Sequence, residues 1–294
     1  MDSLHDDEQA ALMTHHTSPT VLISPAMAVP SRYYRPVVDA FARREWFAAT
    51  IPRRGLDPGT DAPSRSEDWS YADEADDLSA AVRRVRAQTP GAPVMILGHS
   101  LGAQLCAVIG QRGGEGAPDA IATVAASVPY FRHYARGGVV EWCTAAAVPI
   151  VTAAVGHWPT PGFGAPAPRT LMREWARMVR TGVTPFDGGD PIEIPTLAVR
   201  LADDRLVPAR AAERFERAFH PAARTTWTYS ADDCPPGGSV GHVRWARTPD
   251  AVVDRIVDWW TSQLGEDVTR RRPRRNVSIT ATTTPSTAKP IIDA

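Results

Sequence analysis

One serine lies in a sequence context that is typical of an activated nucleophile. Ser100 is the centre of Gly98-His99-Ser100-Leu101-Gly102, which follows an apolar run at 94–97 and precedes a stretch of small residues. This order predicts a strand, a tight turn and a helix. Such a turn forces the serine into a strained backbone conformation that is tolerated when glycines flank it, and the strain exposes the hydroxyl. Ser100 is therefore the candidate nucleophile, and the backbone N–H of Leu101 is a candidate donor to an oxyanion.

A nucleophilic serine needs a base that takes its proton and an acid that orients the base. A strand predicted at 196–201 ends in Ala202-Asp203-Asp204, and carboxylates at that position lie at the carboxyl edge of a parallel sheet. We choose Asp204 as the acid because it lies four residues before Pro208. Asp203 is then expected to be a loop or helix-capping residue.

Two of the eight histidines, His220 and His242, lie after this candidate acid. His242 is in a glycine-flanked loop between the last predicted strand and the last predicted helix, so the loop presents it at the same sheet edge. His220 ends a predicted helix and precedes Pro221, which indicates a helix-terminus role. We therefore predict His242 as the base, and we expect His99 to pack beside the serine.

A second oxyanion donor is expected from the loop that follows the first predicted strand. This loop reads Pro25-Ala26-Met27-Ala28-Val29. Counted back from Tyr34-Arg35-Pro36, Met27 takes the position that supplies such an N–H. Met27 and Leu101 are therefore the two candidate oxyanion donors.

Strands alternate with helices along most of the chain, which predicts the α/β class with a doubly wound, mostly parallel sheet. The predicted strands are 20–24, 46–51, 94–97, 120–125, 196–201 and 225–229. The predicted helices are 33–44, 71–88, the stretch after Ser100, 209–219 and 249–264. The helix at 71–88 has acidic residues in its first turns and arginines in its last, as the helix dipole favours.

The alternation stops between about 130 and 191, which predicts a helical cap inserted over the site. Its apolar run, 139–155, contains Glu141 and Pro149. The run is shorter than the roughly 20 apolar residues of a membrane span, so we expect no span. Four of its residues are candidates for substrate binding: Trp142, Val148, Ile150 and Val151. They favour acyl chains over sugars or charged groups, unless they form only the core of the cap.

The composition is that of a globular protein, with 43% hydrophobic residues, 22% charged residues and a formal net charge of −1. This charge gives no electrostatic reason to expect nucleic acid as a partner. The three cysteines, Cys106, Cys143 and Cys234, fit neither a disulfide framework nor a zinc site, so we expect reduced thiols.

The two ends of the chain differ from the middle in composition. Residues 1–17 form an acidic lead-in without the features of a secretion signal, and 265–294 form a basic and then threonine-rich tail. We expect both ends to be disordered, the folded domain to cover 18–264, and the protein to be cytoplasmic.

The sequence resembles the α/β-hydrolase superfamily, and within it a family of bacterial serine hydrolases related to the serine aminopeptidase and monoacylglycerol lipase group. The matching stretches are Ser31 to Pro36, Asp68-Trp69, 98–102, Tyr130 to Tyr134, Glu174 to Arg177, Asp203-Asp204 and Gly241-His242. The chain departs from the family at Pro25-Ala26, where many relatives carry His-Gly, and at Pro52-Arg53-Arg54-Gly55. The resemblance implies a capped hydrolase fold and a serine hydrolase, and it names no substrate.

We therefore expect an esterase-like enzyme that cleaves a carboxylic ester or thioester of a small, largely apolar substrate. Ser100 attacks the carbonyl, His242 is the base and Asp204 orients it, with no metal or organic cofactor required. Acyl transfer, amide or peptide cleavage and perhydrolysis on the same triad are alternatives. A non-catalytic binding protein on the same fold is the alternative from another class.

Overall fold

The computed structural model describes residues 18–160 and 163–271, and the chain forms two compact units, 1–257 and 258–294. The first unit contains a six-stranded sheet in the order β2-β1-β3-β4-β7-β8. Its strands are β1 (Thr20–Ser24), β2 (Ala48–Thr50), β3 (Val94–His99), β4 (Ala120–Val124), β7 (Thr196–Leu201) and β8 (Arg224–Tyr229). Every pairing is parallel. The predicted α/β class and parallel sheet are confirmed.

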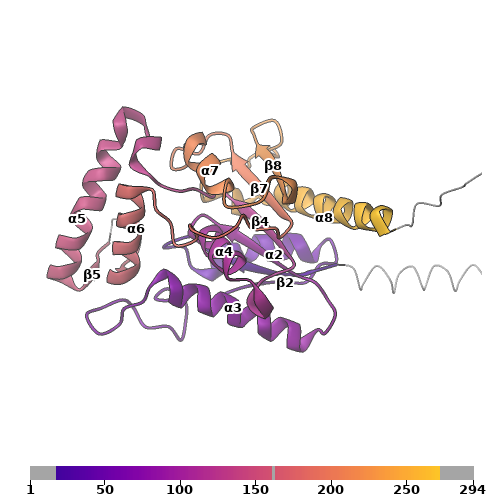
Figure 1. Ribbon diagram of the computed structural model, residues 1–294, viewed down its shortest axis with the longest axis horizontal. Helices are drawn as coiled ribbons and strands as arrows, with labels where there is room; N and C mark the ends of the chain where they lie inside the picture. The colour runs from indigo at the N-terminus through magenta and orange to yellow at the C-terminus, as the bar shows by residue number, and fades with distance from the viewer. Residues whose placement is uncertain (1–17, 161–162, 272–294) are drawn as a thin grey trace, which may run out of the picture. The chain divides into compact units, whose positions relative to one another are not determined.

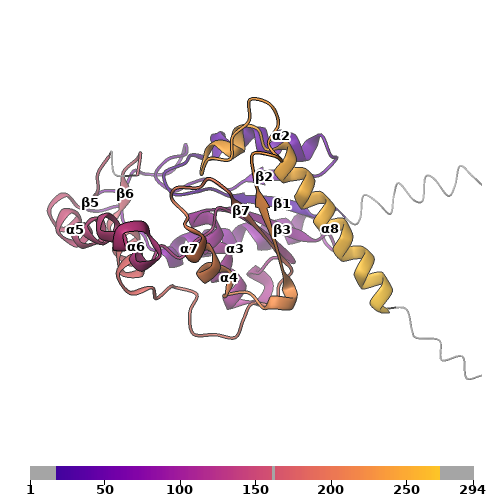
Figure 2. The ribbon, with the colours of Figure 1, turned by 90° about the horizontal axis from the view of Figure 1, so that it is seen from above.

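The order of the strands explains which helices cover which face. The helices are α2 (Arg35–Ala42), α3 (Tyr71–Gln88), α4 (Leu101–Arg112), α7 (Ala209–Glu216) and α8 (Asp250–Arg271). From β1 the chain moves one way to β2 and then the opposite way through β3, β4, β7 and β8. Because parallel crossovers are right-handed, α2 lies on one face and α3 and α4 on the other (Figures 1 and 2).

The helix α3 begins and ends where its charge pattern predicts. Ser70 is its N-cap and accepts a hydrogen bond from the Asp73 N–H, while the Asp73 side chain accepts one from the Ser70 N–H, which completes a capping box. Acidic residues occupy the first turn and Arg86 the last. Local sequence alone therefore fixes both ends of this helix.

Other element boundaries differ from the predictions. The predicted helix at 33–44 is a 3-10 turn, Ser31–Tyr34, followed by α2, and β2 is shorter than the predicted 46–51. α7 ends at Glu216, and α8 continues past the predicted end at Leu264 to Arg271. Outside the segment 130–191, the other short 3-10 turns are Gly114–Gly116, Pro221–Ala223 and Arg244–Arg247. The predicted lead-in, 1–17, and the tail from 272 onward lie outside the described residues.

The segment predicted as a cap folds largely as a pair of helices. Two 3-10 turns, Phe131–His133 and Ala135–Gly138, lead into α5 (Val139–Val155); the short strands β5 (His157–Trp158) and β6 (Ala167–Pro168) then lead to α6 (Arg169–Thr181). α5 packs against α6, and α6 lies between α5 and the sheet (Figures 1 and 2).

The helical stretch Ala135–Val155 is 21 residues long and apolar enough, by length and composition, to cross a membrane. This exceeds the length that the sequence predicts, because the 3-10 turn runs directly into α5. Arg136 and Gly137 have left-handed backbone angles, so the regular α-helix still covers 17 residues. The stretch is 22% buried, whereas the core helix of a soluble protein is mostly buried.

A buried ion pair joins the loop after β2 to α3. Arg53 Nη1 lies 2.8 Å from Glu74 Oε2, with both side chains almost fully buried. Burial raises the pKa of Glu74, and the Arg53 charge opposes that rise. The neighbouring pair, Arg54 with Asp77, is more than a third exposed on both sides. The two pairs therefore offer a matched comparison of buried and exposed charge.

We expect Arg53→Ala to lower the free energy of unfolding by about 3–5 kcal/mol, because it leaves the Glu74 carboxylate buried without its partner. Arg54→Ala should cost about 1 kcal/mol or less, since its pair is solvated. Urea unfolding followed by circular dichroism measures both. Equal losses for the two variants would contradict a special role for the buried pair.

Candidate active site

The turn at Ser100 has the strained geometry that the sequence predicts. Ser100 lies between β3 and α4 with φ 53° and ψ −113°, and its N–H donates to the Val124 carbonyl at 3.0 Å. A Cβ on Gly102 would collide with the Ser24 carbonyl, and one on Gly98 would lie 2.6 Å from the Ala103 Cα. Close backbone approach therefore requires glycine at both flanking positions.

The three residues predicted as a triad lie together at the carboxyl edge of the sheet. Ser100 follows β3, Asp204 follows β7 and His242 follows β8. His242 Nε2 lies 3.1 Å from Ser100 Oγ, and His242 Nδ1 lies 2.6 Å from Asp204 Oδ2. Both distances are within hydrogen-bonding range. The chain Ser–His–Asp is continuous, and its acid is almost fully buried.

The second carboxylate oxygen of Asp204 accepts a hydrogen bond from the backbone of its own loop. Asp204 Oδ1 accepts the Leu206 N–H at 2.9 Å, which fixes the carboxylate plane while Oδ2 faces His242. The adjacent Asp203 is exposed. Asp204, the residue chosen from its spacing to Pro208, is the carboxylate that lies within hydrogen-bonding distance of His242.

His220 lies in a local capping arrangement. Its Nδ1 accepts the Ala222 N–H at 3.2 Å, and its own N–H donates to the Ile192 carbonyl. The residue is the N-cap of the 3-10 turn Pro221–Ala223. His220 is thus at a helix terminus, but it begins this turn and does not end the preceding helix as predicted, since α7 ends at Glu216.

The predicted oxyanion loop follows β1 at the same sheet edge as Ser100. The Ala26 N–H donates to the Tyr34 hydroxyl at 2.9 Å, and the Val29 N–H donates to the Ala26 carbonyl at 3.2 Å. The Ala26 and Val29 N–H groups are thus already engaged, whereas no such bond within the described residues engages the N–H of Met27, the candidate donor of this loop. Leu101 is the first residue of α4, so the helix offers no acceptor for its N–H.

The buried Tyr34 and His99 connect this loop to the candidate base, His242, and this connection was not predicted. Tyr34 Oη lies 2.7 Å from His99 Nδ1, and His99 Nε2 lies 2.8 Å from the carbonyl oxygen of His242. The His99 ring also packs against the rings of His242 and Trp245. The bridge runs from the Ala26 N–H through two fully buried side chains to the backbone of the base.

The direction of each hydrogen bond in the bridge follows from its partners. A carbonyl oxygen accepts only, so His99 Nε2 carries the proton and donates to His242. His99 Nδ1 then accepts from the Tyr34 hydroxyl, whose oxygen accepts from Ala26. Burial lowers the pKa of His99 well below its usual range and raises that of Tyr34, so both side chains stay neutral.

The four residues predicted to bind substrate are not brought together. Val148 has no accessible surface and packs in the apolar core, which fits the alternative that it is core of the cap. Ile150 is 73% exposed, Trp142 is exposed and Val151 is half-buried. A helix that is apolar on every side gives no sequence signal for which side faces the site, so the choice among its residues could not be made from the pattern.

A hollow beside Asp204 is lined by other cap residues. It has a volume of about 560 Å³ and lies between the start of α5 and the loop after β7. Val139, Val140 and Arg136 line it from the cap, and Arg205 and Pro208 line it from the loop. The sequence signal that could have found them is their place at the entry to the cap.

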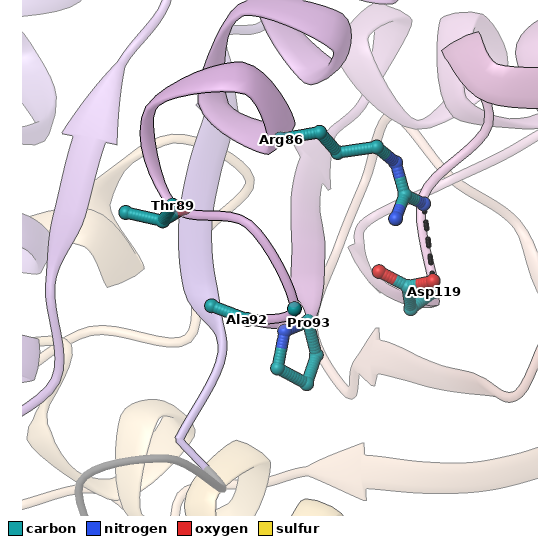
Figure 3. A pocket seen from close by; sticks show the side chains of 6 residues that line it. Arg86, Thr89, Ala92, Pro93 and Asp119 are labelled. Carbon is teal, nitrogen blue, oxygen red and sulfur yellow. Dashed lines mark hydrogen bonds and ion pairs between the residues drawn. The ribbon is translucent and has the colours of Figure 1, made fainter.

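A second hollow lies at the amino end of β3 and is unrelated to the triad (Figure 3). Arg86, Thr89, Pro93 and Asp119 line it, and Arg86 forms an ion pair with Asp119 at 3.0 Å (Figure 3). The Asp119 carboxylate also accepts the Val94 N–H. The charges of Arg86 and Asp119 are paired with each other, so we assign no chemistry to this hollow.

Within residues 18–160 and 163–271, no cluster of three or more histidine, cysteine, aspartate or glutamate side chains is placed to hold a metal ion. Cys106, Cys143 and Cys234 are free thiols. The polar groups assembled at the carboxyl edge of the sheet are the hydroxyl, imidazole and carboxylate described above.

Comparison with known proteins identifies the family. The model of the serine aminopeptidase family S33 matches residues 15–164, half of the chain. The protein belongs to this family and is a hydrolase with the α/β-hydrolase fold. No curated protein matches the sequence significantly.

Solved structures share the fold at low sequence identity. A metagenome-derived lipolytic enzyme is 16% identical with a TM-score of 0.59, and the match covers 84% of this chain and 95% of that one. Rv0554 of Mycobacterium tuberculosis is 15% identical with a TM-score of 0.60, over 84% and 91%. The type II thioesterase BorB of the borrelidin biosynthetic cluster is 19% identical with a TM-score of 0.50, over 83% and 92%.

Proposed function

We propose that this hydrolase is a serine esterase that cleaves a carboxylic ester or thioester of a small, largely apolar substrate through an acyl-enzyme. The observation that carries the proposal is the continuous hydrogen-bond chain from Ser100 through His242 to Asp204, at 3.1 Å and 2.6 Å. A solvated serine is a weak nucleophile, and this chain is what activates one.

In the first half of the proposed reaction, Ser100 Oγ bonds to the carbonyl carbon while His242 Nε2 takes the hydroxyl proton. The backbone N–H groups of Leu101 and Met27 stabilise the negative oxygen. The intermediate then collapses, the bond to the leaving alcohol or thiol breaks, and His242 returns the proton to that group. Asp204 keeps the imidazole in the tautomer with Nδ1–H and stabilises its protonated form.

In the second half, water attacks the acyl-enzyme, His242 takes its proton and Ser100 leaves with that proton. The products are a carboxylic acid and the regenerated enzyme. Val139 and Val140, which line the hollow beside Asp204, are an apolar surface near the proposed triad and support a largely apolar substrate.

Labelling with a fluorophosphonate probe tests the activated serine without knowledge of the substrate. We expect stoichiometric labelling at Ser100, detected by mass spectrometry of the intact and digested protein, because the probe reacts with serines that a neighbouring base activates. His242→Ala should lose labelling, and His220→Ala should retain it. Failure of the wild-type protein to react would support the alternative of a non-catalytic binding protein.

We expect Tyr34→Phe to lower kcat about tenfold and to leave KM nearly unchanged, since the lost hydroxyl orients the oxyanion loop and the base rather than binding substrate. The buried Ala26 N–H and His99 Nδ1 lose their partner, which should cost about 1–3 kcal/mol of stability. Steady-state hydrolysis of short p-nitrophenyl esters measures the kinetic effect.

Tyr33→Phe is the matched control for Tyr34→Phe, because it removes a tyrosine hydroxyl one residue away. The ring of Tyr33 packs against Arg247. The control variant should leave kcat unchanged. If both variants lower kcat equally, or if Tyr34→Phe changes only thermal stability, the bridge is structural and does not position the reacting groups.

A further inference from the structure

The outer surface of α5 is apolar, and the described residues of the chain leave it exposed. Glu141 is the helix's charged residue, and its buried residues, Ala145, Val148 and Thr152, form a narrow stripe. Five large apolar side chains of the helix are exposed and define what we call the outer face of α5: Val139, Val140, Trp142, Ile150 and Val155. Val140 and Ile150 are both more than 70% exposed.

Such a surface is unusual in water. A helix that is apolar on every side is normally the core of a large protein or a membrane segment, and large contiguous apolar patches mark interaction sites. α6 covers only the buried stripe, and α5 is the outermost helix of the cap (Figures 1 and 2). The outer face is therefore suited to an apolar environment that residues 18–160 and 163–271 do not supply.

Three arginines lie beside α5, one at its start, one at its middle and one near its C-terminus. Arg136 immediately precedes it in the 3-10 turn, Arg173 of α6 contacts Thr152 Oγ1 and the Pro149 carbonyl at its middle, and Arg65 donates to the Ala154 carbonyl near its C-terminus. Each of the three is exposed. None of them forms an ion pair with a carboxylate in the described parts of the chain.

We infer that the outer face of α5 binds the surface of a membrane that contains anionic lipids. In this arrangement α5 lies parallel to the membrane plane, with Val140, Ile150 and Trp142 among the acyl chains. Arg136, Arg173 and Arg65 reach the phosphate groups. Apolar side chains with tryptophan on one surface and arginines beside it are the composition of helices that lie in the interface.

The contacts of α5 argue against a helix that crosses the bilayer. Its buried stripe packs on α6, and Arg173 ties the two helices together. A regular helix of this length spans about 25 Å, less than the roughly 30 Å of hydrocarbon. A helix held against the cap along its length can lie on the surface without losing these contacts.

The charges also argue against a second copy of the chain as the occupant. In a symmetric dimer the same face meets itself, which brings the three arginines of each copy close to those of the other. Glu141 is the acidic residue that α5 offers in return. Anionic headgroups, in contrast, complement all three arginines.

The outer face borders the hollow beside Asp204. Val139, Val140 and Arg136 belong to the hollow that Asp204 lines. Membrane binding itself does not depend on the proposed esterase function, and it can be measured on an inactive protein.

Co-sedimentation with vesicles tests the inference. The full chain carrying Ser100→Ala, which cannot turn over lipid, is mixed with vesicles of phosphatidylcholine and phosphatidylglycerol, or of phosphatidylcholine alone. We expect binding to the mixed vesicles that weakens in high salt and is weaker on the neutral vesicles. Adding Val140→Asp and Ile150→Asp together should lower the partition coefficient at least about tenfold, because two deeply inserted apolar groups are lost.

Phe47→Asp is the matched control, because Phe47 is equally exposed but lies before β2, outside the cap. It should bind like the parent. Arg65→Gln with Arg136→Gln should lower the preference for anionic vesicles by about fivefold per arginine and leave the weak binding to neutral vesicles unchanged. Thermal melts by circular dichroism establish that each variant is folded.

Three outcomes would overturn the inference. The first is an absence of binding to mixed vesicles. The second is a folded Val140→Asp, Ile150→Asp variant that binds as well as the parent. The third is a dimer in solution, measured by sedimentation equilibrium, that this variant dissociates while vesicles bind neither form, which would identify a second copy as the occupant.

Discussion

Ser100→Ala should lower kcat on short p-nitrophenyl acyl esters by about 10⁴-fold or more while the protein stays folded. The hydroxyl is the atom that would bond to the substrate, and its removal eliminates the covalent route. The residual rate would come from the Leu101 and Met27 N–H groups and from binding alone. Alanine also has to adopt the φ of 53° observed at this position, which glycine tolerates better.

Ser100→Gly is therefore the matched second variant, because it removes the hydroxyl without the strain. Both variants should be equally inactive, and differences between them should appear only in thermal stability. Wild-type turnover by either folded variant would show that Ser100 is not the nucleophile. Loss of activity with loss of the folded state in both would leave stability as the cause, which the melting curves distinguish.

The strained turn at Ser100, the candidate nucleophile, could be predicted from the sequence because its steric demands are local. Gly98 and Gly102 flank the serine, and the chain comes so close at both positions that a Cβ would collide with the backbone. The strand before the turn and the helix after it also have clear patterns of their own. The positions of Asp204 and His242 followed from strand order, since residues after parallel strands gather at one sheet edge.

The bridge through Tyr34 and His99 could not be predicted in the same way. Tyr34 and His99 are 65 residues apart in the sequence, and His99 and His242 are 143 residues apart. No local pattern encodes such contacts. Tyr34 lies in a stretch that resembles the family, but that resemblance alone does not say which hydroxyl points to the oxyanion loop.

For the cap, prediction from the sequence was limited in a different way. Its position in the chain and its apolar helix were predicted, but the surface that the helix leaves uncovered was not. The residues of α5 are apolar on every side, so a buried helix and an exposed one have the same composition. Only the packing of Ala145, Val148 and Thr152 on α6 distinguishes the covered stripe from the outer face of α5.

The choice between two adjacent carboxylates gives the second large expected effect. Asp204→Asn should lower kcat by about 10³–10⁴-fold, while Asp203→Asn should leave it within about twofold. The asparagine amide can present its N–H₂ to His242 Nδ1, which then accepts and leaves the proton on Nε2, where it faces Ser100. An imidazole in that tautomer cannot take the serine proton.

The same pair of variants distinguishes a role of Asp204 in orienting His242 from a role in stabilising the fold. Asparagine keeps the size of aspartate and its remaining oxygen can still accept the Leu206 N–H, so the loop after β7 should hold and the melting temperature should change little. Fluorophosphonate labelling should slow in proportion to kcat for Asp204→Asn, because both report the activation of Ser100. If Asp203→Asn is the slower enzyme, the acid is Asp203, and the 2.6 Å contact between Asp204 and His242 is structural.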